Sequence, residues 1–261
     1  MRRQAEAFDP DALDRRDPAL IGRLLPFVEA FNKYYLRLDS DGAESIVGQQ
    51  PTLFVANHNG GILGPDLFCT LAVLWRRLGP AQPLYALAHD FAMRQLTPLG
   101  RLLQKIGAIR ASRENARRVL DSGGSLLVYP GGDLDAYRHF SARDRVVLLP
   151  RTGFVEVARA AQVPVVPIVA KGAHRSALIF SEGRLLARLL GLKRWARLER
   201  FPLALALPWI VAPGPWLPYA PLPLQIQLRI LPPRRLDPQL STHAAALQIQ
   251  TEMQRTLDRL P

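Results

Sequence analysis

A histidine in a glycine-rich loop is the side chain best placed to do chemistry. His58 follows the apolar run 53–56, lies in the loop Asn57-His58-Asn59-Gly60-Gly61 and precedes Asp66 by eight positions. An imidazole held by a carboxylate is a good general base near neutral pH, because it can take the proton from a hydroxyl that attacks a carbonyl. The spacing therefore predicts a His58–Asp66 dyad that needs no covalent intermediate, although a lone histidine is more often structural.

The sequence offers little for nucleophilic catalysis. It contains no Gly-x-Ser-x-Gly segment. The single cysteine, Cys69, lies three positions after Asp66, and we expect it to face the core. One cysteine also excludes an internal disulfide framework and a multi-cysteine metal site, so a reducing compartment is the expectation.

Two further segments could hold a phosphate or an oxyanion. The segment Tyr129-Pro130-Gly131-Gly132-Asp133 follows a second apolar run, and its glycines would let backbone N–H groups approach an anion closely. Arg110 and Arg113 precede a predicted helix and could bind phosphate. Each segment has a plainer interpretation, because Pro-Gly-Gly is also a simple turn and arginines are often solvated surface charges.

Apolar runs alternate with helical periodicity along the chain. The predicted strands are 53–56, 125–129, 163–170 and 225–230, and the predicted helices begin near residues 17, 65, 91, 112, 154 and 241. This alternation predicts an α/β fold, a three-layer sandwich whose central, mostly parallel or mixed sheet is flanked by helices. We expect a flexible tail at 1–16, an N-terminal amphipathic helix region at 17–48 and the main domain at 49–261.

Within the main domain, residues 184–228 have the composition of a membrane-associating segment. Its first part, 184–197, is basic and amphipathic, and residues 202–228 carry no charge. Prolines within this uncharged run exclude a transmembrane helix, whereas Trp209, Trp216 and Tyr219 suit the water–lipid interface. The alternative is an ordinary surface helix followed by a buried proline-rich loop.

The formal net charge of +12 implies an anionic partner. Zinc-finger spacing, a basic region with heptads and an aromatic RNA-binding signature are all missing, which argues against nucleic acid. An anionic membrane surface or a phosphate-bearing substrate fits better. The N-terminal residues lack the apolar run of a signal peptide, so we expect the protein at the cytoplasmic face of the membrane, as a peripheral or monotopic protein.

Four segments, in this order, resemble the glycerolipid acyltransferase family, which includes the lysophosphatidic acid acyltransferases. The segments are Asn57-His58 with Asp66, Gly107–Arg113, Tyr129–Gly132 and Val163–Pro167. Two features depart from the usual pattern. The acid follows the histidine after seven residues rather than four, and Gly131 stands where the family usually has Glu. The Pro-Gly-Gly form resembles the branch that includes diacylglycerol acyltransferase-like and plant ester-synthase-like enzymes, and the proline-rich stretch after residue 200 also resembles a branch of the family.

The resemblance implies direct transfer of a fatty acyl group from acyl-CoA or acyl carrier protein to a hydroxyl of a (lyso)glycerolipid or related lipid alcohol, without a metal or other cofactor. His58, oriented by Asp66, would deprotonate the hydroxyl, backbone donors at Gly131 and Gly132 would steady the oxyanion, and Arg113 would hold an acceptor phosphate. The other residues expected to contact substrate are Asn57, Gly60, Gly61, Arg110, Tyr129, Pro130, Asp133, Asp135, Arg138 and His174.

Two other functions stay open from the sequence. The same His-Asp pair could act on water, which would make the protein an ester or thioester hydrolase. Alternatively, the basic and apolar segments could belong to a non-catalytic membrane-binding protein in which His58 has no chemical role.

Overall fold

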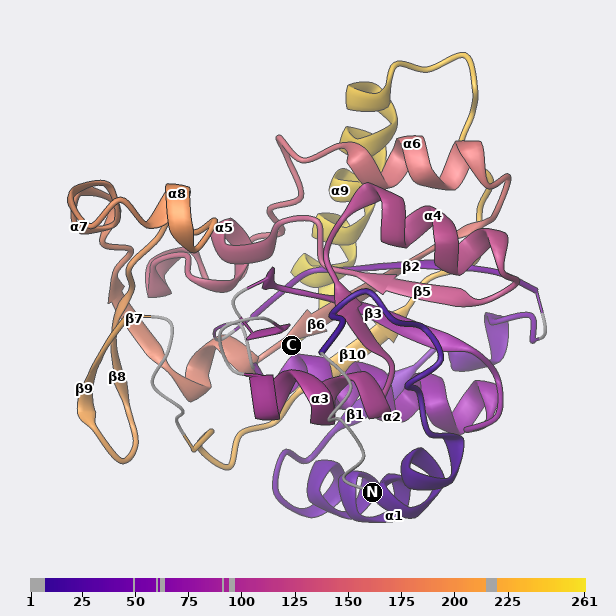
Figure 1. Cartoon of the computed structure of the whole chain (residues 1–261). Coiled ribbons are helices and arrows are strands. Elements are labelled where there is room, and N and C mark those ends of the chain that lie inside the picture. Colours follow the sequence, from indigo (N-terminus) through magenta and orange to yellow (C-terminus); the bar gives the residue numbers. More distant parts are fainter. Residues whose placement is uncertain are drawn as a thin grey trace, which may run out of the picture.

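The computed structural model describes residues 8–48, 50–59, 61, 64–90, 92–93, 97–214 and 220–261, without the side chains of Thr97 and Trp195. These residues form a seven-stranded sheet in the order β1-β10-β6-β2-β5-β3-β4 (Figure 1). The strands are β1 (Asp39–Asp41), β2 (Leu53–Ala56), β3 (Leu84–Ala88), β4 (Ala108–Arg110), β5 (Ser125–Val128), β6 (Val165–Lys171) and β10 (Gln227–Ile230).

Five adjacent strands of this sheet, β6, β2, β5, β3 and β4, run parallel. Strand β10 pairs antiparallel with β6, and β1 runs parallel to β10. Parallel strands end at the same edge of a sheet, and ligands of open α/β sheets bind outside that carboxyl edge. The residues that follow β2, β3, β4 and β5 therefore gather there, among them His58, His89, Arg113 and Tyr129.

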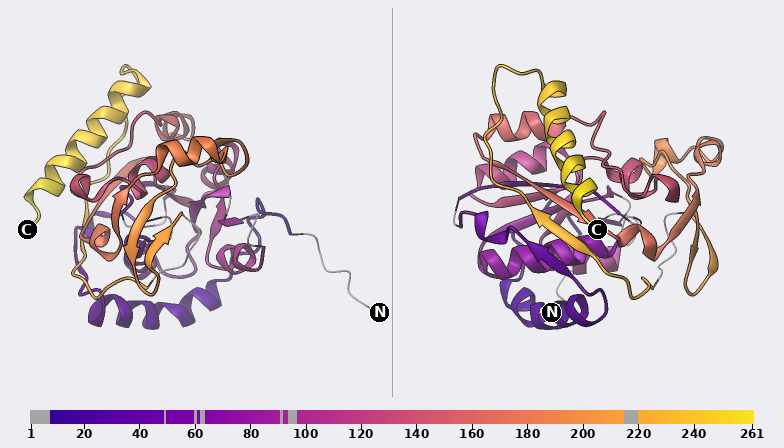
Figure 2. Two further views of the ribbon diagram at one scale, coloured as in Figure 1. Left: turned by 90° about the vertical axis from the view of Figure 1, so that its left-hand side faces the viewer. Right: turned by 180° about the vertical axis from the view of Figure 1, so that it is seen from behind.

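Helices cover both faces of the sheet and make three layers. One face carries α1 (Pro18–Tyr34), α2 (Pro65–Leu78) and α3 (Thr97–Lys105), and the other carries α4 (Arg113–Asp121), α6 (Gly153–Ala160) and α9 (Thr242–Arg259). Figure 2 shows α1 and α9 on opposite sides of the sheet. The predicted fold class is confirmed.

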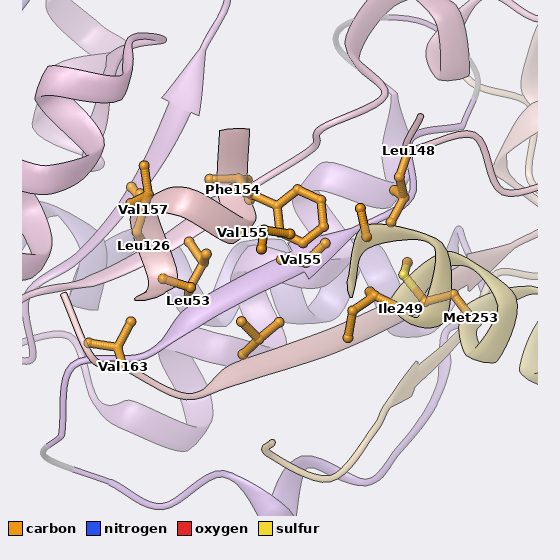
Figure 3. Close-up of a cluster of buried hydrophobic side chains, with 14 of the residues drawn as sticks. Leu53, Val55, Leu126, Leu148, Phe154, Val155, Val157, Val163, Ile249 and Met253 are labelled. Atoms are coloured by element: carbon orange, nitrogen blue, oxygen red, sulfur yellow. The ribbon is translucent and has the colours of Figure 1, made fainter. Parts of the chain in front are cut away.

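The alternation of side chains along β2 explains why both faces need cover. Phe54 and Ala56 pack in the core beneath α1 and α2, whereas Leu53 and Val55 pack in the core beneath α6 and α9 (Figure 3). Successive residues of a strand point to opposite faces, so an uninterrupted apolar run is stable only between two helical layers.

The helices begin where the sequence places caps. Asp17 accepts a hydrogen bond from the backbone N–H of Leu20 ahead of Pro18, and Ser112 and Ser241 cap α4 and α9 in the same way. Short helical turns complete the main domain: η1 (Ala43–Ser45), α5 (Gly132–Ala136), η3 (Phe140–Ala142) and η4 (Ala173–Ser176).

Strand β3 was not predicted. The helix expected from residue 91 is seen as α3 (Thr97–Lys105), and residues 91 and 94–96 lie outside the described residues. The β3 sequence Leu84-Tyr85-Ala86-Leu87-Ala88 lacks β-branched residues, so its composition does not favour a strand. Its position between β5 and β4, where it is paired on both sides, decides its conformation.

The described part of the predicted tail is packed against the domain. Arg16 donates to the carbonyls of Pro80 and Gln82 at 2.5 and 2.7 Å, and Asp11 forms an ion pair with Arg110. The prediction of a flexible tail is therefore wrong for residues 8–16. Residues 1–7 lie outside the described part of the chain.

A second, smaller sheet lies beside the carboxyl edge of the large one, on the left of Figure 1. Its antiparallel strands are β7 (Leu178–Ser181), β8 (Leu203–Ala206) and β9 (Ile210–Pro213), and the helices α7 (Arg184–Leu189) and α8 (Leu192–Trp195) lie between β7 and β8 in the chain. We call these elements the small-sheet unit. The alternative of a buried proline-rich loop is wrong for 203–213, where Ile210 is 74% exposed.

None of the helices in the described ranges combines the length and the apolar character needed to cross a bilayer.

The packing of β2 predicts that truncating the side chain of Phe54 lowers the free energy of unfolding strongly. Phe54 is fully buried, so Phe54→Ala should lower the free energy of unfolding by about 3–5 kcal/mol, through lost burial and the cavity left behind. Denaturant unfolding measures this. Leu247→Ala on α9, where the side chain is 44% exposed, is the matched control and should change it by about 0.5 kcal/mol or less. Equal effects of the two substitutions would contradict this packing.

Candidate active site

The imidazole of His58 lies against a buried carboxylate. Its Nδ1 is 2.9 Å from Oδ2 of Asp66, which has no exposed surface and lies in the first turn of α2. The same oxygen accepts the backbone N–H of Asn59 at 3.1 Å. The seven intervening residues thus let the acid reach the ring, because the chain turns back before α2 begins.

Two asparagines fasten the His58 loop to β6. The side chain of Asn57 makes a pair of hydrogen bonds with the backbone of Ala170, at 2.8 and 3.0 Å, and Asn59 Nδ2 donates to the Ala170 carbonyl at 2.9 Å. Asn57 was expected to contact substrate. It instead joins the ends of two neighbouring strands and so holds the loop at the carboxyl edge.

A buried ion pair, Asp135 and Arg138, forms hydrogen bonds with the backbone of His58. Asp135 accepts the His58 N–H at 2.5 Å, and Arg138 donates to the His58 carbonyl at 2.9 Å and to Asn59 Oδ1 at 2.5 Å. Asp135 and Arg138 pair at 2.5 Å, and Asp135 also accepts the N–H of Val147. Burial raises the pKa of Asp135, while Arg138 and these N–H groups oppose that rise.

The sequence predicted that Asp135 and Arg138 contact substrate. The structure makes them positioning residues instead, because their polar atoms are engaged by each other and by the His58 loop. We call this pair the Asp135–Arg138 brace. Their i, i+3 spacing after the two glycines is the sequence signal for a local pair.

His174 supports the same brace. Its Nε2–H donates to the carbonyl of Arg138 at 2.9 Å, and its side chain is buried. Burial, together with the positive charge of Arg138, lowers its pKa to about 3. The prediction that His174 lines the site is not supported, since it is a neutral structural group behind the loop.

The Tyr129–Asp133 turn approaches the imidazole of His58 through the ring of Tyr129. The ring of Tyr129 lies 4.6 Å from that of His58, centroid to centroid, and desolvation raises the pKa of the phenol well above its ordinary value. Pro130 and Gly132, which were expected to contact substrate, line the adjoining cavity. The N–H of Gly132, however, donates to the carbonyl of Tyr129 within the turn, so it is already engaged.

Gly131 is required by the brace. A Cβ at this position would lie 2.0 Å from the Val147 carbonyl and 2.4 Å from Asp135 Cβ. The glutamate usual in the family has no room here. On the other side of the loop, the N–H of Gly61 donates to the Ala136 carbonyl. Gly60 lies outside the described residues.

A cavity of about 480 Å³ opens beside His58. Most of its wall is apolar: Leu67, Phe68, Leu71, Leu87, Leu103, Ile106, Ala116, Leu126, Val128, Phe154 and Val157. The lining residues with charged or imidazole side chains form a group that we call its mouth: His58, His89, Asp90, Arg113, Asp133, Arg151 and Arg197. Such a chamber suits a ligand with a long apolar part and a charged end.

The two arginines predicted to bind phosphate have different surroundings. Arg110 donates twice to Asp11, at 2.5 and 2.7 Å, and this carboxylate also accepts from Asn115. Arg110 is therefore committed to the N-terminal segment, and its predicted role is not supported. Arg113 lines the cavity, is 70% exposed and makes a surface ion pair with Glu156, so it can turn toward a ligand.

Asp133 lines the mouth but has its oxygens engaged. One accepts from Arg151 at 2.5 Å and the other from the backbone N–H of Glu199 at 2.6 Å. This second bond fastens the small-sheet unit to the active-site turn.

The sequence did not predict four residues at the mouth: His89, Asp90, Arg151 and Arg197. His89 follows β3, the unpredicted strand, and its pKa is lowered by burial. Arg151 reaches Asp133 from the loop before α6, and Arg197 comes from the segment after α8. Nothing local in the sequence marks either arginine. Within the described ranges, no three His, Cys, Asp or Glu side chains converge as a metal site would need.

Comparison with known proteins places the chain in a family. The family described as Acyltransferase matches residues 37–171. Uncharacterized proteins of Mycobacterium tuberculosis (strain ATCC 25618 / H37Rv) and Mycobacterium leprae (strain TN) are 31% and 30% identical over 192 residues, which is 73% of this chain. The chain spans about half the length of these relatives, 53% and 52%. The chain belongs to the acyltransferase family, as the sequence motifs predicted.

A solved structure agrees at the level of the fold. The crystal structure of the 1-acyl-sn-glycerophosphate (LPA) acyltransferase PlsC from Thermotoga maritima is similar over 92% of this chain and 80% of that one. The TM-score is 0.59 and the sequence identity 14%.

The burial of His174 predicts a pH-dependent stability. The unfolded imidazole takes up a proton near pH 6.5, whereas the folded one resists it down to about pH 3. The free energy of unfolding should therefore fall as the pH drops below 6.5, by up to about 1.4 kcal/mol per pH unit from this group. His174→Gln keeps a donor but cannot titrate. Denaturant unfolding between pH 7 and 4 should give a steeper slope for the wild type, and parallel curves would contradict the assignment.

Proposed function

We propose that the protein is an O-acyltransferase that moves a fatty acyl group from acyl-CoA or acyl carrier protein to the hydroxyl of a lysoglycerolipid or related lipid alcohol. The observation that carries this proposal is the His58–Asp66 pair, with Nδ1 and Oδ2 2.9 Å apart, at the wall of a large apolar cavity. Family membership and a fold like that of PlsC support the reaction class.

The geometry indicates how His58 would act. Asp66 accepts the Nδ1–H, which leaves Nε2 with the lone pair that can take a proton. The acceptor hydroxyl loses its proton to Nε2 as its oxygen attacks the thioester carbonyl. The new C–O bond forms, the C–S bond breaks, and the leaving thiolate recovers the proton from His58. No covalent enzyme intermediate is needed, and orientation within the cavity supplies much of the rate.

The apolar wall favours acyl transfer over hydrolysis. A chamber lined by leucine, alanine, valine and phenylalanine suits an acyl chain better than it suits an ordered water. The test is to incubate the purified protein with labelled acyl-CoA, with and without 1-acyl-glycerol 3-phosphate or monoacylglycerol. Labelled product lipid that depends on the acceptor supports the proposal. Free fatty acid released at the same rate regardless of acceptor would show a hydrolase.

The assignment of the base predicts the effect of removing it. His58→Ala should lower kcat for acyl transfer by at least about 1,000-fold, because both the base and its orientation by Asp66 are lost. Asp66→Asn should also lower kcat, since the Nδ1–H loses its charged acceptor. The control is His139→Ala, an exposed histidine bonded to Ser141, which should leave kcat unchanged. Wild-type rates in His58→Ala would refute the assignment.

We also propose that the small-sheet unit attaches the protein to the anionic, cytoplasmic face of a membrane. Leu185, Leu189 and Ile210 are 70%, 75% and 74% exposed, and Trp209 is 46% exposed. Leu185 and Leu189 lie on α7, and Trp209 and Ile210 lie at the β8–β9 turn; large exposed apolar side chains mark candidate interaction surfaces. Basic residues of α7 and α8 accompany them: Arg184, Arg188, Lys193 and Arg194. Apolar insertion with basic contacts to anionic headgroups is the physics of peripheral membrane binding. Trp216 and Tyr219, predicted to take part, lie outside the described residues.

This attachment predicts a selective loss of vesicle binding. The double substitution Leu185→Glu/Leu189→Glu should weaken binding to vesicles of phosphatidylcholine with anionic lipid by at least about 10-fold, because two insertions are lost and two like charges are added. Vesicle sedimentation measures it. Leu247→Glu, at a leucine on α9 that is 44% exposed, should bind as the wild type does. Unchanged binding of the double variant would place the membrane contact elsewhere.

A further inference from the structure

We propose that Arg197 is a phosphate-binding residue at the mouth of the cavity, where it acts with Arg113 on a phosphate group of a substrate. The inference rests on the proposed function for the identity of that substrate. It concerns a residue outside the segment 37–171 that the family match covers.

Two hydrogen bonds fix the segment that carries Arg197 to the active-site edge. The N–H of Glu199 donates to Asp133 Oδ2 at 2.6 Å, and the carbonyl of Arg197 lies 3.4 Å from His89 Nε2. The flanking residues Ala196 and Leu198 are buried in a cluster with Leu192. The backbone at 197 is thus held on both sides, and Arg197 is one of the residues that line the cavity.

Arg197 and Arg113 line the same cavity from different elements. Strands β3 and β4 are neighbours, and the N–H of Ala111 donates to the carbonyl of Ala88. His89 follows Ala88 directly, and Arg113 is two residues beyond Ala111. Because Arg197 lies against His89, its positive charge contributes to the lowered pKa of that imidazole, after burial. The mouth therefore carries one arginine from the main domain, Arg113, and one from the segment after α8, Arg197.

The charge of Arg197 has no internal partner in the described part of the chain. Arg151 pairs with Asp133 and Arg113 pairs with Glu156, but no carboxylate lies within ion-pair distance of the Arg197 guanidinium. A guanidinium offers planar paired donors that match phosphate oxygens. The unpartnered guanidinium beside a neutral imidazole therefore favours an anionic ligand.

The backbone at Arg197 adopts a conformation that is unfavourable for its side chain, as it does at three other described non-glycine residues. Its φ is +55°, in the left-handed region, where side chains other than glycine are disfavoured. The same unit uses glycine for this conformation at Gly183 and Gly191, with φ of +59° and +62°. An arginine at 197 in place of glycine is consistent with a side chain retained for ligand binding.

The phosphate could come from the acceptor or from the pantetheine donor, and binding assays separate the two. Calorimetry with a short-chain 1-acyl-glycerol 3-phosphate below its micelle concentration reports the acceptor source, and calorimetry with CoA reports the donor source. For one of these ligands, Arg197→Gln should raise Kd by about 10-fold or more, because a charge-assisted hydrogen bond is lost. Arg197→Lys should recover part of the affinity.

Arg255→Gln is the matched control. It removes the same charge from an exposed site on α9, and Arg255 does not line the cavity, so both Kd values should stay at wild-type levels. In turnover, Arg197→Gln should raise KM for the phosphate-bearing substrate and leave KM for monoacylglycerol unchanged. Unchanged Kd for both phosphate ligands would overturn the proposal.

Arg197→Gly separates binding from folding. Glycine relieves the left-handed strain, so the melting temperature should equal or exceed that of the wild type while phosphate binding is weakened. Weaker binding accompanied by a lower melting temperature would indicate a structural role and overturn the proposal. If the wild type binds the phosphate ligand through Arg197 but transfers no acyl group, the proposed function fails and the binding site stands.

Discussion

The active site depends on one buried ion pair. Asp135 and Arg138 are removed from water together, and their remaining hydrogen-bonding capacity is directed to the N–H and carbonyl of His58. Breaking such a pair from one side costs about 3–5 kcal/mol, because it leaves a buried charge without compensation. Two neighbouring residues make this buried pair possible. Gly131 leaves room for Asp135, and His174 stays neutral because it is buried behind Arg138.

This arrangement gives the two carboxylates near His58 separate tasks. Asp66 meets the imidazole ring and determines which nitrogen carries the proton, whereas Asp135 meets the backbone and has its charge balanced by Arg138. The ring therefore interacts with one uncompensated carboxylate rather than two. The brace also joins β2 to the turn after β5, and Asp133 in that turn joins the small-sheet unit. The small-sheet unit is thus linked by hydrogen bonds, through Asp133 and the brace, to the loop that carries His58.

The sequence predicted what depends on local patterns. The strand before His58, the helix that begins at Pro65 and the order of the family motifs are properties of short segments, and they were predicted correctly. The roles of Asp135, Arg138 and His174 were not, because burial and partners are set by segments far apart in the chain. Arg110 is the clearest case, since its partner Asp11 lies in a segment predicted to be a free tail. The β8–β9 hairpin was missed because its prolines suggested a loop.

A double-mutant cycle between Arg138 and His58 tests most directly whether the brace acts through the base. Arg138→Lys keeps a cation beside Asp135 but loses the forked contacts to His58 and Asn59. In the wild-type background, it should lower kcat for acyl transfer by about 100-fold, as expected for a displaced catalytic group. In the His58→Ala background, it should have no further effect on the residual rate. The same fold-loss in both backgrounds would contradict the account.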